Sequence, residues 1–211
     1  TVCADTPRTN YVVSFGANVD VSGGVCAVRR HADARVRGIH RVSIEPHLSI
    51  TGATSAEWVP IKPKTDPAFM LAMVHVLVCE VELGRLDVPF LRDRTAAPYL
   101  VGPDGYYLRD AASGKPLLWD SVREAAVAFD TPDTVPALSG SWTLAEAVSH
   151  RADGEVAPHR EVTARTAHDM TVEGMRQFSP EWAAGICDVP AATIRRVALD
   201  YLRHACIGET I

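Results

Sequence analysis

This sequence of 211 residues lacks the short motifs that most often identify an enzyme active site. It contains no Gly-x-Gly-x-x-Gly fingerprint, so a generic NAD site is not indicated. It also contains no His-Glu-x-x-His pair and no Gly-x-Ser-x-Gly nucleophile elbow. The usual signatures of hydrolytic and metal-dependent chemistry are therefore absent.

Cysteine is scarce and unfavourably spaced. The count is odd and no Cys-x-x-Cys pair occurs, which argues against a disulfide framework and against a self-contained zinc or iron–sulfur site. We expect buried thiols and one or two exposed ones among the five cysteines, Cys3, Cys26, Cys79, Cys187 and Cys206.

Long apolar runs and dense positive charge are missing too. The longest apolar run, Ala68–Cys79, is too short to span a bilayer, so we predict no transmembrane segment. The formal net charge is -5 and no basic patch occurs, so we expect no nucleic-acid partner. Residues Thr1–Arg8 contain no initiator Met and no export signal. We therefore expect a piece of a longer protein, whose compartment, bacterial cytoplasm or periplasm, stays open.

The N-terminal part reads as strand, helix and strand. Tyr11–Phe15 is a β-branched and aromatic run typical of a buried strand, and the turn-compatible Gly16–Asn18 follows it. A weak helix is predicted from about residue 20 to 34, and Gly38 should end it. His40–Glu45 is the second predicted strand, so the order fits a βαβ unit.

Further elements follow from apolar spacing and helix caps. Glu57–Ile61 should be extended, and an apolar helix is predicted from Pro67 to about Leu83. Ser179 followed by Pro180 has the pattern of an N-cap and first helical residue. Another helix should begin at Val189–Pro190, because apolar residues recur after it at helical spacing.

Between residues 87 and 162 the helical spacing fades and Pro, Gly and Asp recur. We predict a β-hairpin over Tyr99–Leu108 and a short helix over Ser121–Phe129 that Asp120 caps. Residues 131–140 and 152–159 are predicted to be loops.

The predicted fold is α/β, a three-layer Rossmann-like domain with a mostly parallel sheet. Residues 1–86 and 163–211 would form its core, and residues 87–162 would form an inserted, loop-rich cap with a β-hairpin.

Two carboxylates stand where such a fold binds ligands. Ligands bind beyond the carboxyl ends of the strands in open α/β sheets. Glu45 ends the second strand, where a carboxylate can accept hydrogen bonds from both ribose hydroxyls. Asp66 could accept two parallel bonds from the N1–H and 2-amino group of guanine, with Lys64 and Thr65 within reach of phosphate or ribose oxygens. The backbone of Gly16–Asn18 could approach a diphosphate.

Structural interpretations of the same residues stay open. Asp66 precedes Pro67 and could serve as an N-cap alone. Glu45 could be a solvated strand end, and Asn18 a left-handed turn residue.

Several motifs, in order and spacing, resemble the molybdopterin oxidoreductases of the dimethyl sulfoxide reductase type. The first three are Phe15-Gly-Ala-Asn18, Val42-Ser-Ile-Glu-Pro-His47 and Trp58-Val-Pro-Ile-Lys-Pro-Lys-Thr-Asp66. Those downstream are Ala96-Ala-Pro-Tyr99, Gly114-Lys-Pro-Leu-Leu-Trp-Asp120, Ser179-Pro-Glu-Trp-Ala-Ala184 and Val189-Pro-Ala-Ala-Thr-Ile-Arg-Arg196. The resemblance covers nearly the whole chain and is weakest from Val135 to Thr171.

The resemblance implies a domain that holds one of two molybdopterin guanine dinucleotides around molybdenum or tungsten. It places Gly16, Ala17 and Asn18 at the diphosphate, Glu45 and Pro46 at the ribose, and Lys64, Thr65 and Asp66 at the guanine. His47 and Thr51 complete the candidate cofactor-binding set.

Two positions depart from the family pattern. His47 stands where many members have Arg, which weakens an expected anion contact. Lys64 stands where many members have Gly.

The resemblance also implies parts that this sequence does not contain. The family's cysteine motif for a 4Fe–4S cluster and the residue that ligates the metal would lie upstream. We expect as partners the remaining domains of a parent enzyme and an iron–sulfur electron-transfer subunit. Catalysis by this chain alone is not expected. The alternative is a metal-free nucleotide-binding or interaction module with the same α/β fold.

Overall fold

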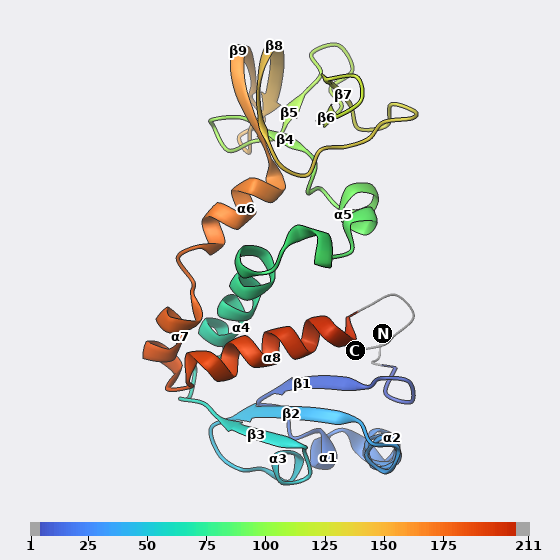
Figure 1. Ribbon diagram of the computed structural model, residues 1–211, viewed down its shortest axis with the longest axis vertical. Coiled ribbons are helices and arrows are strands. Elements are labelled where there is room, and N and C mark those ends of the chain that lie inside the picture. Colours follow the sequence, from blue (N-terminus) through green and yellow to red (C-terminus); the bar gives the residue numbers. More distant parts are fainter. Residues whose placement is uncertain (1–4, 206–211) are drawn as a thin grey trace. The chain divides into compact units, whose positions relative to one another are not determined.

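The computed structural model describes residues 5–205 and shows two compact units (Figure 1). The first unit combines Thr1–Val81 with Met175–Ile211, and the second unit is Glu82–Gly174. The chain thus leaves the first unit once and returns to it.

A small parallel sheet forms the centre of the first unit. Its strands are β1 (Tyr11–Phe15), β2 (His40–Glu45) and β3 (Glu57–Pro60), in the spatial order β1-β2-β3. The predicted bounds of the first two strands are confirmed. The register pairs Phe15 with Ile44 and Glu45 with Pro60, so all three strands end at one edge.

Two helices connect β1 to β2. They are α1 (Val19–Ser22) and α2 (Gly24–Arg37), so the weak helix predicted there forms in two pieces. Gly38 ends α2 with φ of 96°, and its N–H donates to the carbonyls of Ala34 and Arg35. This left-handed conformation explains the glycine.

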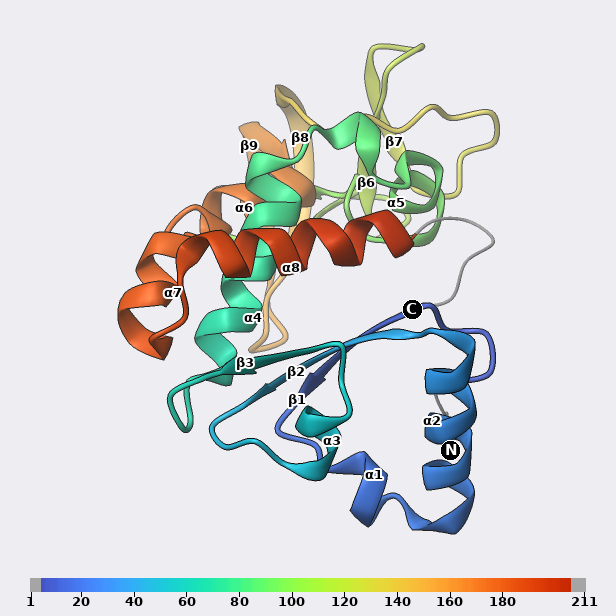
Figure 2. The same ribbon diagram turned by 60° about the horizontal axis from the view of Figure 1, so that its bottom comes forward.

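Helices cover both faces of this sheet, as Figure 2 shows. On one side lie α1, α2 and the short α3 (Ile50–Ala53). On the other lie α4 (Asp66–His75), α7 (Pro180–Cys187) and α8 (Ala191–His204). The core between sheet and helices includes Tyr11, Val42, Ile44, Val59, Phe69, Ala72, Ala183, Ile194 and Val197.

The helix predicted from Pro67 to Leu83 is shorter than expected. The α-helix ends at His75 and continues as a π-helical turn, η1 (Val76–Glu80). Gly84 instead lies in a 3₁₀ turn, η2 (Leu83–Arg85), of the second unit. By contrast, the predicted cap at Ser179 is confirmed, because its Oγ accepts a hydrogen bond from the N–H of Trp182 at 3.2 Å.

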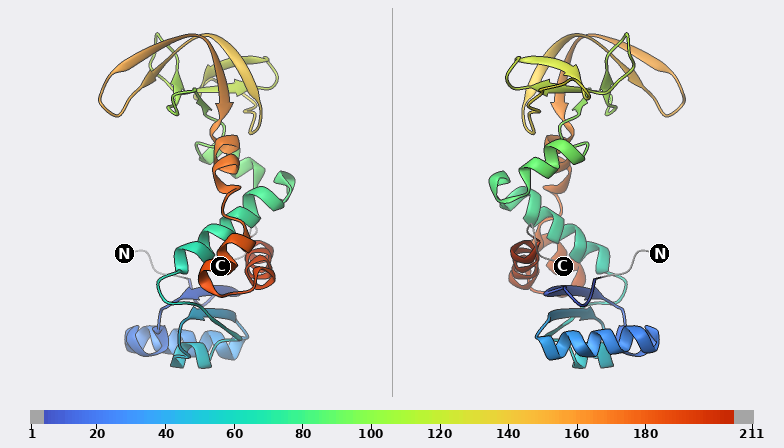
Figure 3. Two further views of the ribbon diagram at one scale, coloured as in Figure 1. Left: turned by 90° about the vertical axis from the view of Figure 1, so that its left-hand side faces the viewer. Right: turned by 90° about the vertical axis from the view of Figure 1, so that its right-hand side faces the viewer.

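The second unit consists mainly of antiparallel strands (Figure 3). After α5 (Val88–Arg94), a four-stranded sheet has the order β4-β9-β8-β5, and β6 pairs with β7. The strands are β4 (Leu100–Val101), β5 (Leu108–Arg109), β6 (Leu117–Asp120), β7 (Ala125–Ala128), β8 (Ser141–His150) and β9 (Val156–Thr166). Helix α6 (Ala167–Met175) follows β9. The chain therefore has a mixed α/β fold with a small parallel sheet and an antiparallel half-barrel.

Two local predictions fail in the second unit, and a third is confirmed only in part. Ser121–Phe129 is a turn followed by β7, because pairing with β6 overrides the helix propensity of its alanines. The loop predicted over residues 152–159 ends early, since β9 begins at Val156. The predicted hairpin over Tyr99–Leu108 keeps one bridge between Val101 and Tyr107, while β4 and β5 pair with β9 and β8.

One buried ion pair ties α1, β2 and α3 together in the first unit. Asp20 lies in α1 and its side chain is 6% exposed, while Arg41 lies on β2 and its side chain is 3% exposed. The guanidinium donates to both oxygens of Asp20, at 3.2 and 2.7 Å, and to the carbonyl of Thr51 at 3.1 Å. Thr54 Oγ1 also donates to Asp20 Oδ2 at 2.7 Å. Buried charges with this many partners are costly to separate.

We predict that Arg41→Met destabilises the first unit by about 3–5 kcal/mol, because it leaves the buried carboxylate of Asp20 with only the more exposed guanidinium of Arg35, 3.6 Å away. The measurement is hydrogen-exchange protection of the β2 amides. The double variant Asp20→Leu/Arg41→Met should recover more than half of the loss. If Arg41→Met lowered the free energy of unfolding by less than about 1 kcal/mol, the typical contribution of a solvent-exposed ion pair, this role would be contradicted.

The same pair predicts a pH dependence. Burial by itself would raise the pKa of Asp20, but hydrogen bonds from Arg41 and Thr54 outweigh it and lower the pKa. The stabilisation is therefore complete above the unfolded-state pKa of about 3.9 and is lost as the pH falls through the folded value. Between pH 5 and pH 3, β2 protection should fall more in the wild type than in Asp20→Asn. Equal losses in the two proteins would argue against this linkage.

Candidate functional site

Three loops meet at the carboxyl edge of the parallel sheet. They follow β1 at Gly16–Asn18, β2 at Pro46–Ser49 and β3 at Ile61–Thr65. Ligands bind at this edge in open α/β sheets. The structure thus places the predicted site residues in or next to these three loops, except Thr51, which lies in α3 and hydrogen-bonds to the first loop.

The first loop presents backbone at an open surface. Gly16 has φ of 58°, and its N–H donates to the carbonyl of Ile44 at 3.0 Å. No atom lies within 4 Å of the position that a Cβ would occupy at Gly16. The side chain of Asn18 turns towards the second loop, where its Oδ1 accepts bonds from the N–H and hydroxyl of Thr51, at 3.3 and 3.0 Å.

Thr51 joins the two loops. Its hydroxyl donates to Asn18 Oδ1 and accepts from the N–H of Asp20 at 3.0 Å. The residue is 0% exposed. Thr51 therefore holds the first loop in place from inside the protein, and its hydroxyl has no surface to offer a ligand in this conformation.

Glu45 is buried rather than solvated. Its side chain is 2% exposed, and Oε1 accepts bonds from the N–H and Oγ of Ser49, at 2.9 and 2.8 Å. Ser49 Oγ in turn accepts the N–H of Gly52 at 3.1 Å and caps α3. A Cβ on Gly52 would lie 2.1 Å from Glu45 Oε1, so a side chain does not fit there. The alternative of a solvated strand end is wrong.

Glu45 keeps some hydrogen-bonding capacity at the sheet edge. Its Oε2 has no hydrogen-bond donor among residues 5–205, yet it is not among the fully buried unpaired atoms of that range. The backbone carbonyl of Glu45 accepts the indole N–H of Trp58 at 3.1 Å. The neighbouring Pro46 and His47 are exposed. The predicted contact of Glu45 with a ribose stays a prediction.

The third loop ends in a carboxylate without a protein partner. Asp66 is the first residue of α4, and the N-cap position belongs to Thr65, so Asp66 is not the N-cap. No hydrogen bond or ion pair to its carboxylate occurs within residues 5–205, although the residue is half-buried. Lys64 has φ of 67°, a left-handed conformation that explains why glycine is common there in the family that the sequence resembles. Thr65 Oγ1 donates to the carbonyl of Lys62 at 2.6 Å.

The part of the chain that the structure describes shows no candidate site for a metal ion or for a reactive thiol. Within residues 5–205, no group of three or more His, Cys, Asp or Glu side chains could hold a metal ion. Cys26 is exposed, Cys79 is half-buried and Cys187 is buried, and burial raises the pKa of the last two thiols. Cys3 and Cys206 lie outside the described residues. No described helix is long and apolar enough to cross a membrane.

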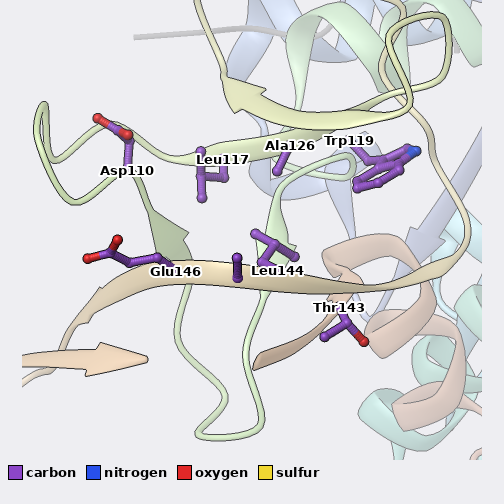
Figure 4. Close-up of a pocket in the computed structure, with 8 residues that line it drawn as sticks. Asp110, Leu117, Trp119, Ala126, Thr143, Leu144 and Glu146 are labelled. Atoms are coloured by element: carbon purple, nitrogen blue, oxygen red, sulfur yellow. The ribbon is translucent and has the colours of Figure 1, made fainter. Parts of the chain in front are cut away.

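A concave region lies in the second unit, and the sequence did not predict it. Figure 4 shows this groove, which has a volume of about 390 Å³. We call it the β8 groove, and Asp110, Leu117, Trp119, Ala126 and Thr143–Glu146 line it. Trp119 also stacks on Trp142, with ring centroids 4.8 Å apart. No local sequence signal reveals the groove, because it depends on pairing between distant strands.

Known proteins give the chain a family. It is 30% identical to a sulfite dehydrogenase chain of Allochromatium vinosum over 176 residues, which is 77% of this chain and 16% of that protein. It is 28% identical to the alpha chain of perchlorate reductase from Dechloromonas aromatica, over 94% of this chain and 24% of that protein. A third relative is a putative dimethyl sulfoxide reductase catalytic chain of Halobacterium salinarum, 33% identical over 66% of this chain and 17% of that protein.

A solved structure supports the fold. Acetylene hydratase from Pelobacter acetylenicus matches with a TM-score of 0.52 and 14% identity, over 93% of this chain and 17% of that protein. At this identity the match concerns the fold alone. No family model matches the chain.

These three relatives are named as a dehydrogenase and two reductases. The chain is homologous to part of the molybdoenzymes of the dimethyl sulfoxide reductase family, and it corresponds to a fragment of such a protein. Members of this family carry molybdenum with two molybdopterin guanine dinucleotides. The chain spans between about a sixth and a quarter of the length of these relatives.

We predict that Thr51→Val loosens the first loop, because Asn18 Oδ1 and the N–H of Asp20 both lose their hydroxyl partner. An unpaired buried polar group costs about 1–3 kcal/mol. Faster amide exchange at Ala17–Asp20 is the expected result. Thr51→Ser keeps the hydroxyl and should stay close to the wild type. Equal exchange in Thr51→Val and wild type would contradict the role of this hydroxyl.

Proposed function

We propose that the first unit is a three-layer Rossmann-like domain that binds the guanosine diphosphate end of one molybdopterin guanine dinucleotide. The parent enzyme would be a molybdenum or tungsten oxidoreductase. The observation that carries this proposal is the carboxylate of Asp66. It is half-buried at the ligand-binding edge of the sheet and has no partner among residues 5–205.

The hydrogen-bonding groups at this edge suit the proposed ligand. The free carboxylate of Asp66 is an acceptor pair for the N1–H and 2-amino group of guanine, and adenine has no donors at those positions. The exposed cation of Lys64, two residues earlier, complements a phosphate or ribose oxygen. The open backbone at Gly16 permits close approach of a diphosphate.

In the proposed complex, the second loop and Glu45 before it contact the ribose. In this proposal Glu45 Oε2 faces the ribose hydroxyls, while Oε1 stays committed to Ser49. Pro46 and His47 form the exposed surface beside it. Thr51 acts from inside the protein by holding Asn18 and so the first loop in position.

The domain binds and orients the cofactor and does no chemistry alone. When bound, the metal and its pterin supply two-electron redox chemistry, and the protein supplies binding and orientation. The protein ligand of the metal and any 4Fe–4S cluster would come from other parts of the parent enzyme. Several relatives are named as single subunits of larger enzymes, which favours an electron-transfer partner.

We predict that the chain binds GDP at least about tenfold more tightly than ADP, since hydrogen bonds to a charged group contribute about 1.5–3 kcal/mol. Titration of the ¹⁵N-labelled chain followed by amide chemical shifts detects even millimolar affinities. The largest shifts should occur at Gly16–Asn18 and Lys64–Asp66. Asp66→Asn should remove the preference, because one amide oxygen replaces two carboxylate oxygens.

The matched control is Asp33→Asn. It removes the same charge from α2, where Asp33 makes an exposed ion pair with Arg29 at 3.9 Å. This variant should retain the preference for GDP. Equal affinities for GDP and ADP in the wild type, or shifts confined to other surfaces, would overturn the proposed function.

A further inference from the structure

The β8 groove lies where the half-barrel of the second unit fails to close. A bridge between Tyr99, next to β4, and Leu118 on β6 links the two sheets. The strands therefore follow the order β7-β6-β4-β9-β8-β5, and Arg109 of β5 forms a bridge with Pro116, the residue before β6. Beyond β8, β5 pairs with Val148 and Ser149 alone. Within residues 5–205, the stretch Ser141–Ala147 has no strand on that side.

The lining residues show that an open strand edge faces the groove. Four consecutive residues of β8, Thr143–Glu146, line it, although alternate side chains point to opposite faces of a strand. Leu117 and Ala126 line it from β6 and β7 (Figure 4). The groove therefore runs along the backbone edge of β8, which offers unpaired N–H and C=O groups to an added strand.

One end of the groove is acidic. Figure 4 shows Asp110 and Glu146 at the same end, approaching it from opposite walls. Hydrogen bonds from the N–H and Oγ of Ser113 lower the pKa of Asp110, so its carboxylate stays charged. Glu146 stands opposite Arg160 in the β8–β9 register, yet no ion pair or hydrogen bond engages it in the described chain.

The rest of the groove is apolar and aromatic. Leu144 and Glu146 both line the groove, but the alternation of faces along β8 breaks between Leu144 and Ala147, which are both buried, and Glu161 on the neighbouring strand has φ of 48° there. Trp119 lies at the end away from the carboxylates (Figure 4). A strand lying along β8 would therefore meet acidic side chains at one end of the groove and apolar ones farther along it.

We propose that the β8 groove binds an extended segment of a partner polypeptide, with a basic residue beside Asp110 and Glu146 and an apolar residue farther along the segment beside Leu144. The segment would add as a strand to the edge of β8 and extend the half-barrel. Backbone hydrogen bonds would supply affinity, and the alternate side chains would supply specificity.

Charge complementarity favours a basic partner over a second copy of this chain. The second unit has 15 acidic and 9 basic residues, a net charge of −6. Association of two copies would bring two second units of the same negative charge together, and like charges repel each other.

The experiment uses the ¹⁵N-labelled chain and the peptide acetyl-Thr-Val-Thr-Arg-Thr-amide. The expected result is amide shifts at Thr143–Ala147 and slower hydrogen exchange there when the peptide is bound. A Gln-for-Arg peptide should bind about five- to tenfold more weakly, because it lacks the cation. An Arg peptide with methylated backbone nitrogens should not bind, because strand pairing needs those N–H groups.

Variants of the chain test the acidic end separately. In Glu146→Gln the preference for the Arg peptide should fall to about twofold. The control Glu155→Gln removes the same charge from an exposed position and should keep the full preference. Equal binding of Arg and Gln peptides, shifts away from β8, or binding of the methylated peptide would each overturn the proposal. Self-association of the chain through β8 would also overturn it, in favour of a second copy.

Discussion

The arrangement of the carboxyl edge depends on one hydroxyl group and the buried ion pair next to it. Thr51 Oγ1 bonds to both Asn18 and the backbone of Asp20, so the loop after β1 is fixed to the segment after β2. Arg41 then clamps the side chain of Asp20 and the carbonyl of Thr51 from β2. Parallel strands have no hairpin turn to set the spacing of their loops. Buried polar contacts set that spacing here.

Local patterns predicted much of the first unit because local physics determines it. The β-branched run of β1, the left-handed glycine that ends α2 and the cap at Ser179 each depend on a few neighbouring residues. The placement of Glu45 and Asp66 at strand and helix boundaries followed from those elements. The surroundings of these two side chains could not be predicted from the elements alone. The partner of Glu45 is four residues away, and the sequence offers no sign that Ser49 turns inward to meet it.

The second unit was harder to predict because its strands pair over long distances. The alanines of β7 favour a helix locally, and pairing with β6 overrides them. Strand β5 pairs with β8 across about forty residues, so no local window contains both sides of the ladder. Likewise Asp110 and Glu146 are ordinary surface carboxylates in the sequence. Only the fold brings them to one end of a groove.

Unmet hydrogen-bonding capacity distinguishes the carboxylates that we propose as binding groups from those that stabilise the fold. Asp20 has its charge satisfied by Arg41, and its lowered pKa reflects that commitment to the fold. One carboxylate oxygen of Glu45 accepts hydrogen bonds from Ser49, and the other oxygen has no hydrogen-bond donor in the described chain. Within residues 5–205, Asp66 at the sheet edge and Glu146 in the β8 groove have no hydrogen-bond or ion-pair partner. A carboxylate that is partly shielded from water is stabilised by a hydrogen-bonding or charged partner. A ligand at Asp66, or a partner chain at Glu146, would therefore contribute more binding free energy there than at a fully solvated carboxylate.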